Sequence, residues 1–164
     1  MKSITLLRHA KSSWNHADLT DYDRPLNKRG ERDAPVMGQR LSAQNIRPSL
    51  ILSSPAKRAW TTARIVAENM NYPREFLQRD DRLYGASVNT ILDVIRDQDP
   101  GFNNIMLVGH NPGLTQFANL LVPDITPNLP TCGVVSVVID ADNWDHQSWP
   151  DATLVLFDYP KRVE

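Results

Sequence analysis

Arginine and histidine side chains that could bind and transfer a phosphoryl group stand at three places along the chain, each just after an apolar segment. Arg8 and His9 follow the first segment, Arg58 follows the second, and His110 follows the third. Arginine matches phosphate oxygens with paired hydrogen bonds, each worth about 1.5–3 kcal/mol. A neutral imidazole is a nucleophile near pH 7 and accepts phosphoryl groups. The pattern predicts a phosphate pocket that contains a nucleophilic histidine.

A pocket of this kind needs a sheet that brings the three apolar segments side by side. Short β-type runs alternate with segments of helical spacing, which indicates an α/β fold with a mostly parallel sheet. Several runs are apolar on both faces, so helices are expected to cover both sides of the sheet. The expected strands are 3–8, 49–54, 75–78, 104–109, 133–140 and 152–159. The expected helices are 27–45, 55–70, 89–97 and 112–121.

Two of the helices carry the same start signal, a capping residue followed by proline. The signal is Ser54-Pro55 for one helix and Asn111-Pro112 for the other. Ligands of open α/β sheets bind beyond the carboxyl ends of the strands. We therefore expect both helix N-termini to add backbone N–H groups to the pocket.

Length and composition describe an ordinary globular protein. The chain has 164 residues, with 41% hydrophobic and 23% charged residues, which favours a single domain over residues 1–164. Its formal net charge is -1. A nucleic-acid-binding protein would need a clear basic excess, so no nucleic-acid partner is expected.

The sequence also predicts a cytoplasmic location. No apolar run reaches the roughly 18 residues that a membrane span needs, so no membrane partner is expected. The N-terminal apolar run is broken at Arg8, which makes it too short for a signal peptide. Cys132 is the only cysteine, which fits a reducing compartment.

Three other classes of phosphate chemistry do not fit the sequence. A cysteine phosphatase needs arginine six positions after the cysteine, but Val138 stands six positions after Cys132. The chain contains neither GxxxxGK[ST] nor GxGxxG, the loops that hold nucleotides. A metallophosphoesterase needs clustered Asp, His and Asn ligands, and "GHNPG" alone does not make that pattern. No metal and no cofactor are therefore expected.

Four segments carry a resemblance to a known family. They are "LLRHA", "DRPLNKRG", "SSPAKRAWTTA" and "VGHNPG", and they span residues 4–114. In order and spacing they resemble the histidine phosphatase superfamily, and most closely its short phosphohistidine phosphatases of the SixA type. The resemblance implies a three-layer, phosphoglycerate-mutase-like sandwich.

The resemblance also implies roles for the residues at the strand ends. His9 matches the nucleophile of a covalent phosphohistidine mechanism that uses no metal, and Arg8 and Arg58 match the arginines that hold the phosphate. His110 matches the second histidine, which stabilises the transition state. Ala10 departs from the family, which has glycine there, and should be tolerated if its φ is below zero.

Further candidates extend this set. In "DDRLYG", Asp81 precedes Gly85 by four residues and is the candidate general acid, a role worth about 10²–10⁴-fold in rate. A phosphate linked to nitrogen needs such an acid less, because the leaving imidazole is easily protonated. The remaining candidates for binding phosphate or substrate are Arg24, Ser13, Asn15 and Asn111.

The expected activity is hydrolysis of a phosphorylated protein, with inorganic phosphate as product. Only short connections separate the elements after the second helix, so no long insertion roofs the pocket. An open pocket gives little binding energy to a small molecule but admits a side chain on another protein. A histidine-containing phosphotransfer domain that carries phosphohistidine would be such a substrate. The alternatives are a small-molecule phosphoester phosphatase of the same fold and a non-catalytic phosphohistidine-binding module.

Overall fold

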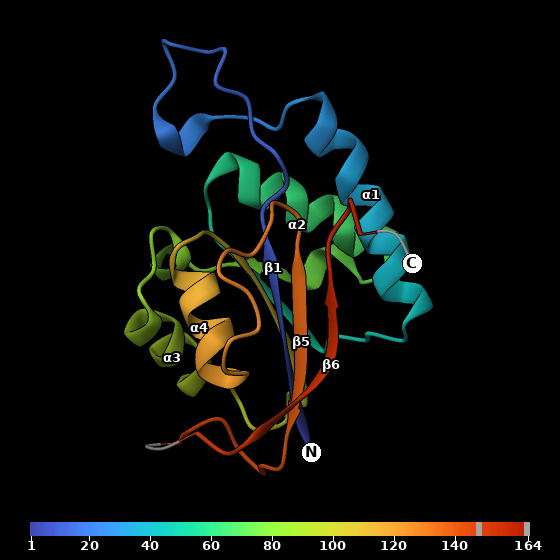
Figure 1. Cartoon of the computed structure of the whole chain (residues 1–164), viewed down its shortest axis with the longest axis vertical. Coiled ribbons are helices and arrows are strands. Elements are labelled where there is room, and N and C mark those ends of the chain that lie inside the picture. Colours follow the sequence, from blue (N-terminus) through green and yellow to red (C-terminus); the bar gives the residue numbers. More distant parts are fainter. Residues whose placement is uncertain (147–148, 163–164) are drawn as a thin grey trace.

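A six-stranded sheet forms the centre of the molecule in the computed structural model, which describes residues 1–146 and 149–162 (Figure 1). Its strand order is β3-β2-β4-β1-β5-β6. The strands are β1 (Lys2–Arg8), β2 (Leu50–Ser53), β3 (Leu77–Arg79), β4 (Asn104–Gly109), β5 (Val134–Ile139) and β6 (Ala152–Asp158). β3, β2, β4 and β1 are parallel, while β5 is antiparallel to both of its neighbours. The mostly parallel sheet is confirmed.

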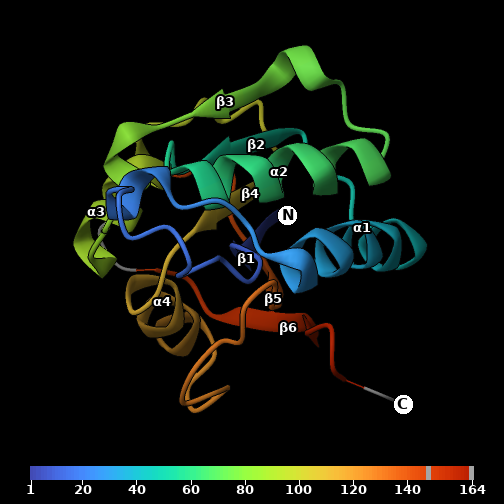
Figure 2. The ribbon, with the colours of Figure 1, turned by 90° about the horizontal axis from the view of Figure 1, so that it is seen from above.

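Four helices cover the two faces of this sheet. They are α1 (Lys28–Ala43), α2 (Lys57–Asn69), α3 (Val88–Arg96) and α4 (Gly113–Leu121). Figure 2 shows α1 and α2 on one face, and α3 and α4 on the other. This is the three-layer α/β sandwich that the sequence predicts. Among the described residues, no helix is long and apolar enough to cross a membrane.

The two faces of the sheet bury separate hydrophobic clusters. On β1, Ile4 and Leu6 join the cluster under α3 and α4, whereas Leu7 joins the cluster under α1 and α2. All three side chains are fully buried. A strand that is covered on both faces is apolar at consecutive positions, which explains why these strands show no alternation of apolar and polar residues in the sequence.

The register of the central strands places the functional segments side by side. β1 pairs with β4 so that Arg8 lies opposite Gly109, and the next residues, His9 and His110, therefore leave the sheet together. On the other side of β4, the backbone N–H of Ser54 donates to the carbonyl oxygen of Val108 at 2.9 Å. The carboxyl ends of β1, β2 and β4 thus meet at one edge, as expected.

Two helices begin later than the sequence predicts. α2 begins at Lys57, not at Pro55, because Ser54 still belongs to the strand ladder and its hydroxyl contacts His110. α4 begins at Gly113, although the Asn111 side chain does accept from the backbone N–H of Thr115 at 3.2 Å. In both places the chain needs two or three residues to turn out of the sheet before a helix can form.

The third expected strand also begins later than predicted. Residues 74–76 form a 3₁₀ turn, and β3 is a three-residue strand that starts at Leu77. Only Leu77 of β3 is buried, and the next two residues are exposed. The apolar signal in "EFLQ" therefore comes from one core residue, because the Phe76 side chain is exposed.

Candidate active site

A pocket of about 210 Å³ opens at the carboxyl ends of β1, β2 and β4. Its walls come from four parts of the chain: the segment after β1, the start of α2, the residues after β4, and Thr131 just before β5. The lining residues are Arg8, His9, Lys11, Ser12, Trp14, Arg24, Arg58, His110, Asn111 and Thr131. Three arginines and two histidines that are distant in sequence therefore surround one small space.

His9 is fixed in the tautomer that a nucleophile requires. Its Nδ1 lies 2.8 Å from the carbonyl oxygen of Ala10, and because a carbonyl can only accept, Nδ1 carries the proton. The second ring nitrogen, Nε2, is left with a free lone pair. Ala10 is fully buried and its φ is not positive, so alanine is tolerated here as expected.

His110 faces His9 and is fixed by the end of β2. The two ring centroids are 5.2 Å apart. The Nε2 atom of His110 lies 2.7 Å from the hydroxyl oxygen of Ser54, which also accepts from the backbone N–H of Ala56. The contact allows either atom to donate, and we assign the tautomer in which the Ser54 hydroxyl donates to His110 Nε2 and the ring proton sits on Nδ1.

Three buried nitrogen atoms in this pocket have no hydrogen-bond partner among the described residues. They are Nε of Arg8, Nε of Arg58 and Nδ1 of His110. A buried donor without an acceptor costs about 1–3 kcal/mol, so native proteins rarely leave one unpaired. Three such donors in one pocket fit an anion with several oxygens, such as a phosphoryl group.

Burial, assisted by the charges of the pocket, keeps both imidazoles neutral. Burial and then the charges of His110, Arg58 and Arg8 lower the pKa of His9 to about 3, against the opposing hydrogen bond to the Ala10 carbonyl oxygen. Burial, followed by the charge of Arg58, lowers the pKa of His110 to about 4. His9 is therefore an unprotonated nucleophile at neutral pH, in a pocket with an excess of positive charge.

Comparisons with known proteins agree with this geometry. Residues 4–86, about half of the chain, match the family described as the histidine phosphatase superfamily (branch 1). This chain belongs to the histidine phosphatase superfamily. An uncharacterized chloroplastic protein of Arabidopsis thaliana is 31% identical to this histidine phosphatase over 88% of the chain and 69% of that protein.

Solved structures of similar proteins share its fold. A protein of Agrobacterium tumefaciens, provisionally named phosphohistidine phosphatase SixA, superposes with a TM-score of 0.81 and 26% identity. The match covers 97% of this chain and 98% of that one. The protein histidine phosphatase SixA complexed with tungstate gives a TM-score of 0.79 at 22% identity, with 96% and 97% covered. Family and neighbours together support phosphatase activity for this chain.

The candidate residues of the sequence divide into those that line the pocket of this histidine phosphatase and those that do not. Arg8, His9, Arg24, Arg58, His110 and Asn111 line it. Ser13 and Asn15 lie beside it without lining it, and the Ser13 hydroxyl accepts from the backbone N–H of Asn15. The Asn111 side chain donates to the carbonyl oxygen of Leu129, which ties the loop before β5 to the start of α4.

Asp81, the candidate general acid, is exposed in a 3₁₀ turn and is not among the residues that line the pocket. The 84–86 turn that follows it does approach the site. The Tyr84 ring lies edge-on to His110, with the centroids 5.6 Å apart. Gly113 permits this approach, because a Cβ there would lie 2.0 Å from the carbonyl oxygen of Ala86.

The carboxylate that does contact the site is Asp21, which the sequence reasoning missed. Its side chain accepts from Tyr84 at 2.7 Å, from Arg58 at 3.0 Å and from Arg24 at 3.3 Å. The Tyr84 hydroxyl, followed by the arginines, lowers the pKa of Asp21 to about 2. Its position in a polar loop does not mark Asp21 as a site residue in the sequence, because only the folded chain brings residues 21, 58 and 84 together.

The lowered pKa values give a prediction for proton titration. Between pH 8 and pH 5, both imidazoles should stay neutral in the folded protein, and His9 should take up a proton only near pH 3. The unfolded chain binds these protons near pH 6.5, so the free energy of unfolding should fall as the pH drops below that value. Imidazole NMR signals, assigned with His9→Asn and His110→Asn variants, would measure the two titration midpoints. Midpoints near 6.5 would contradict the prediction.

Proposed function

We propose that this chain hydrolyses phosphohistidine on a protein through a covalent phosphohistidine intermediate on His9. The observation that carries the proposal is the set of three unpaired donors, on Arg8, Arg58 and His110, in the pocket that contains His9. They supply three N–H groups for phosphoryl oxygens beside a nucleophilic nitrogen whose tautomer is fixed. Such donors stabilise charge on the transferring group, which is where enzymes gain most of their rate.

The reaction has two transfers. In the first, the Nε2 lone pair of His9 forms a bond to phosphorus while the bond from phosphorus to the substrate nitrogen breaks, and the leaving imidazole takes up a proton from solvent. In the second, water attacks phosphorus, the bond to His9 Nε2 breaks, and inorganic phosphate leaves. Arg8 and Arg58 hold the phosphoryl oxygens in both steps, and His110 donates from Nδ1.

A lining without a carboxylic acid, in the described part of the chain, supports a nitrogen-linked substrate. None of the described residues that line the pocket is Asp or Glu, and Asp21 is held ionised by Tyr84 and Arg58. An ester with an alkoxide leaving group loses about 10²–10⁴-fold in rate without a general acid. A phosphorylated imidazole loses less, because its nitrogen is protonated near neutral pH.

The shape of the pocket supports a protein as the carrier of that phosphate. The volume of about 210 Å³ is enough for a phosphoryl group and part of a side chain. The Trp14 side chain stands at the rim, 73% exposed, with the Arg24 guanidinium 3.5 Å from its ring centroid. Aromatic and arginine side chains are enriched where proteins bind one another. A histidine-containing phosphotransfer domain is the phosphoprotein we propose.

A panel of substrates compared by kcat/KM tests this proposal. It should contain a phosphohistidine phosphotransfer domain, a phosphoserine protein, phosphoglycerate, a sugar phosphate and p-nitrophenyl phosphate. The phosphohistidine protein should exceed the three alkyl esters by at least about 10²-fold, the lower bound of a missing general acid, whereas p-nitrophenyl phosphate, whose leaving group needs no proton, serves as the reference. A sugar phosphate or phosphoglycerate that is tenfold better would overturn the proposal in favour of a small-molecule phosphatase. No turnover of any member, with phosphoprotein binding retained, would indicate a binding module.

Activity is also expected to be independent of metal ions. The positive charge next to the phosphoryl group comes from Arg8 and Arg58, which need no cation to assist them. Among the described residues, no three His, Cys, Asp or Glu side chains meet in a group that could hold a metal. Dialysis against EDTA should leave kcat/KM unchanged, with a known metallophosphatase as the inhibited control. A loss that Mg²⁺ or Zn²⁺ restores would contradict this prediction.

A further inference from the structure

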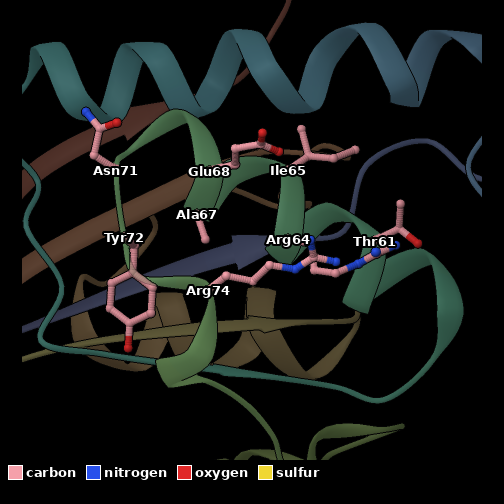
Figure 3. A pocket seen from close by; sticks show the side chains of 8 residues that line it. All are labelled: Thr61, Arg64, Ile65, Ala67, Glu68, Asn71, Tyr72 and Arg74. Atoms are coloured by element: carbon pink, nitrogen blue, oxygen red, sulfur yellow. The ribbon is translucent and has the colours of Figure 1, made fainter.

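A second cavity, of about 570 Å³, lies beside α2 and shares none of its lining with the catalytic pocket. Arg64 of α2 and Arg74 of the following turn both border it, together with Thr61 and Tyr72. Figure 3 shows the two arginine side chains extending toward the same part of the cavity, next to Thr61. Two guanidinium groups that share a cavity repel each other, which favours an anion between them.

These two arginines form no ion pair in the described part of the chain. None of the described ion pairs includes Arg64 or Arg74, and the buried Nε of Arg64 has no hydrogen-bond partner. Glu68 also borders the cavity, but in Figure 3 its side chain points the other way. The cavity thus has free donors for a carboxylate or a similar anion.

The cavity lies beside a row of side chains that starts in the first turn of α2, the turn that also carries Arg58. Lys57, Trp60, Thr61 and Arg64 are spaced along one face of α2, the face opposite its buried side. The Arg79 guanidinium lies 4.0 Å from the Trp60 ring centroid and adds a further cation to the row. We name these side chains, together with Arg74, the α2 face.

The α2 face and the catalytic pocket are close enough for one partner to cover both. Arg58, in the first turn of α2, lines the pocket, and Arg64 is six residues further along, about 9 Å at the helical rise. Figure 2 shows α2 starting next to the 21–23 turn and running away from it across the sheet. A standard protein interface buries about 800 Å² on each partner and easily spans this distance.

We propose that the α2 face docks an acidic segment of the phosphoprotein substrate, with a carboxylate in the cavity between Arg64 and Arg74. This inference rests on the proposed function and adds the chemistry of the partner. Four cations without a described ion pair, Lys57, Arg64, Arg74 and Arg79, stand on one face of a chain whose formal net charge is -1. Complementary charge of this kind speeds encounter and sets the orientation of the partner.

Direct binding of two peptides tests the docking. One fluorescein-labelled peptide carries phosphohistidine with Asp and Glu three to five positions away, and the other carries Asn and Gln in their place. The His9→Ala protein, which leaves the peptides intact during the measurement, should bind the acidic peptide about tenfold more tightly in fluorescence anisotropy at low salt, and salt should reduce the difference. The Arg64→Ala, Arg74→Ala double variant in the same His9→Ala background should bind both peptides equally.

A matched control removes the same charge elsewhere. The Lys161→Ala, Arg162→Ala double variant loses two cations next to β6, the edge of the sheet opposite β3, and should keep the tenfold preference. Turnover of p-nitrophenyl phosphate should stay within twofold in both double variants when His9 is intact, because neither touches the catalytic pocket. A loss of this turnover with Arg64 and Arg74 would show that they support the site itself, which overturns docking.

The same experiment separates docking from the proposed function. Equal binding of both peptides by the His9→Ala protein overturns the docking proposal, whatever the turnover of the wild type. A preference for the acidic peptide, together with a wild-type protein that leaves its phosphohistidine intact, overturns the proposed function and retains the docking surface. An equal drop in affinity in both double variants would indicate a general effect of net charge and would also overturn docking.

Discussion

The His9→Ala variant is expected to lose at least about 10⁴-fold in kcat while keeping the wild-type fold. In the proposed mechanism, alanine removes the nitrogen that forms the bond to phosphorus, and the other imidazole of the pocket cannot replace it, because the Nε2 atom of His110 is held by Ser54. Steady-state turnover of a phosphohistidine protein measures the loss. Far-UV circular dichroism and the thermal midpoint report on the fold.

Trapping of the intermediate makes this prediction specific to the covalent route. After a rapid quench with ³²P-labelled substrate, the wild-type protein should carry phosphate that is labile in acid and stable in base. His9→Ala should carry none, whereas His16→Ala, a histidine on the exposed part of the same loop, should label like the wild type. Wild-type turnover by His9→Ala would show that the phosphoryl group goes directly to water.

Arg58→Ala is expected to lower kcat/KM by about 30- to 1000-fold, more than Arg24→Ala does. The Nε of Arg58 is buried and unpaired, so it is free to bond to the phosphoryl group. Arg24 uses its donors on Asp21 and Ser12 and stacks on Trp14. Removal of Arg24 should therefore loosen the loop that carries Ser12, Trp14 and Asp21 and lower kcat/KM by roughly tenfold. Removal of Arg58 should instead remove hydrogen bonds to the transition state.

The two arginine variants should also differ in whether the loss of kcat/KM comes from kcat or from KM. Because Arg58 bonds to the transferring group, Arg58→Ala should lower kcat, and guanidinium ion added to the buffer should restore part of it. Arg24→Ala should act mainly on KM. Equal losses in both variants, or a loss in Arg58→Ala confined to KM, would show that Arg58 does not bind the phosphoryl group in the transition state.

Residues that stand at the end of a central strand could be located from the sequence. Arg8, His9 and His110 directly follow continuous apolar runs, and such runs become neighbouring parallel strands whose ends meet. Arg58 was found because it lies one turn into the helix after a strand. In each case the local pattern fixes the end of the strand to within a residue or two, and the pairing of the strands then brings these ends together.

Residues that depend on loop conformation could not be located in this way. Asp81 and Asp21 are both acidic residues in polar segments, and nothing in the local sequence distinguishes them. In the folded chain, Asp21 contacts Arg58 and Tyr84, while Asp81 is exposed and is not among the residues that line the pocket. The starts of α2 and α4 were placed too early for a similar reason, because the contact of Ser54 with His110 joins two segments 56 residues apart.

The sequence by itself therefore determined the α/β class, the order of the elements and the arginine and histidine residues at the strand ends. These follow from apolar periodicity and from residue type, which are local properties. The tertiary structure alone decided which carboxylate meets the arginines, which ring nitrogens are free, and that Arg64 and Arg74 share a cavity beside α2. Each of these depends on distances between side chains from different segments, which only the packing of the sheet and its helices sets.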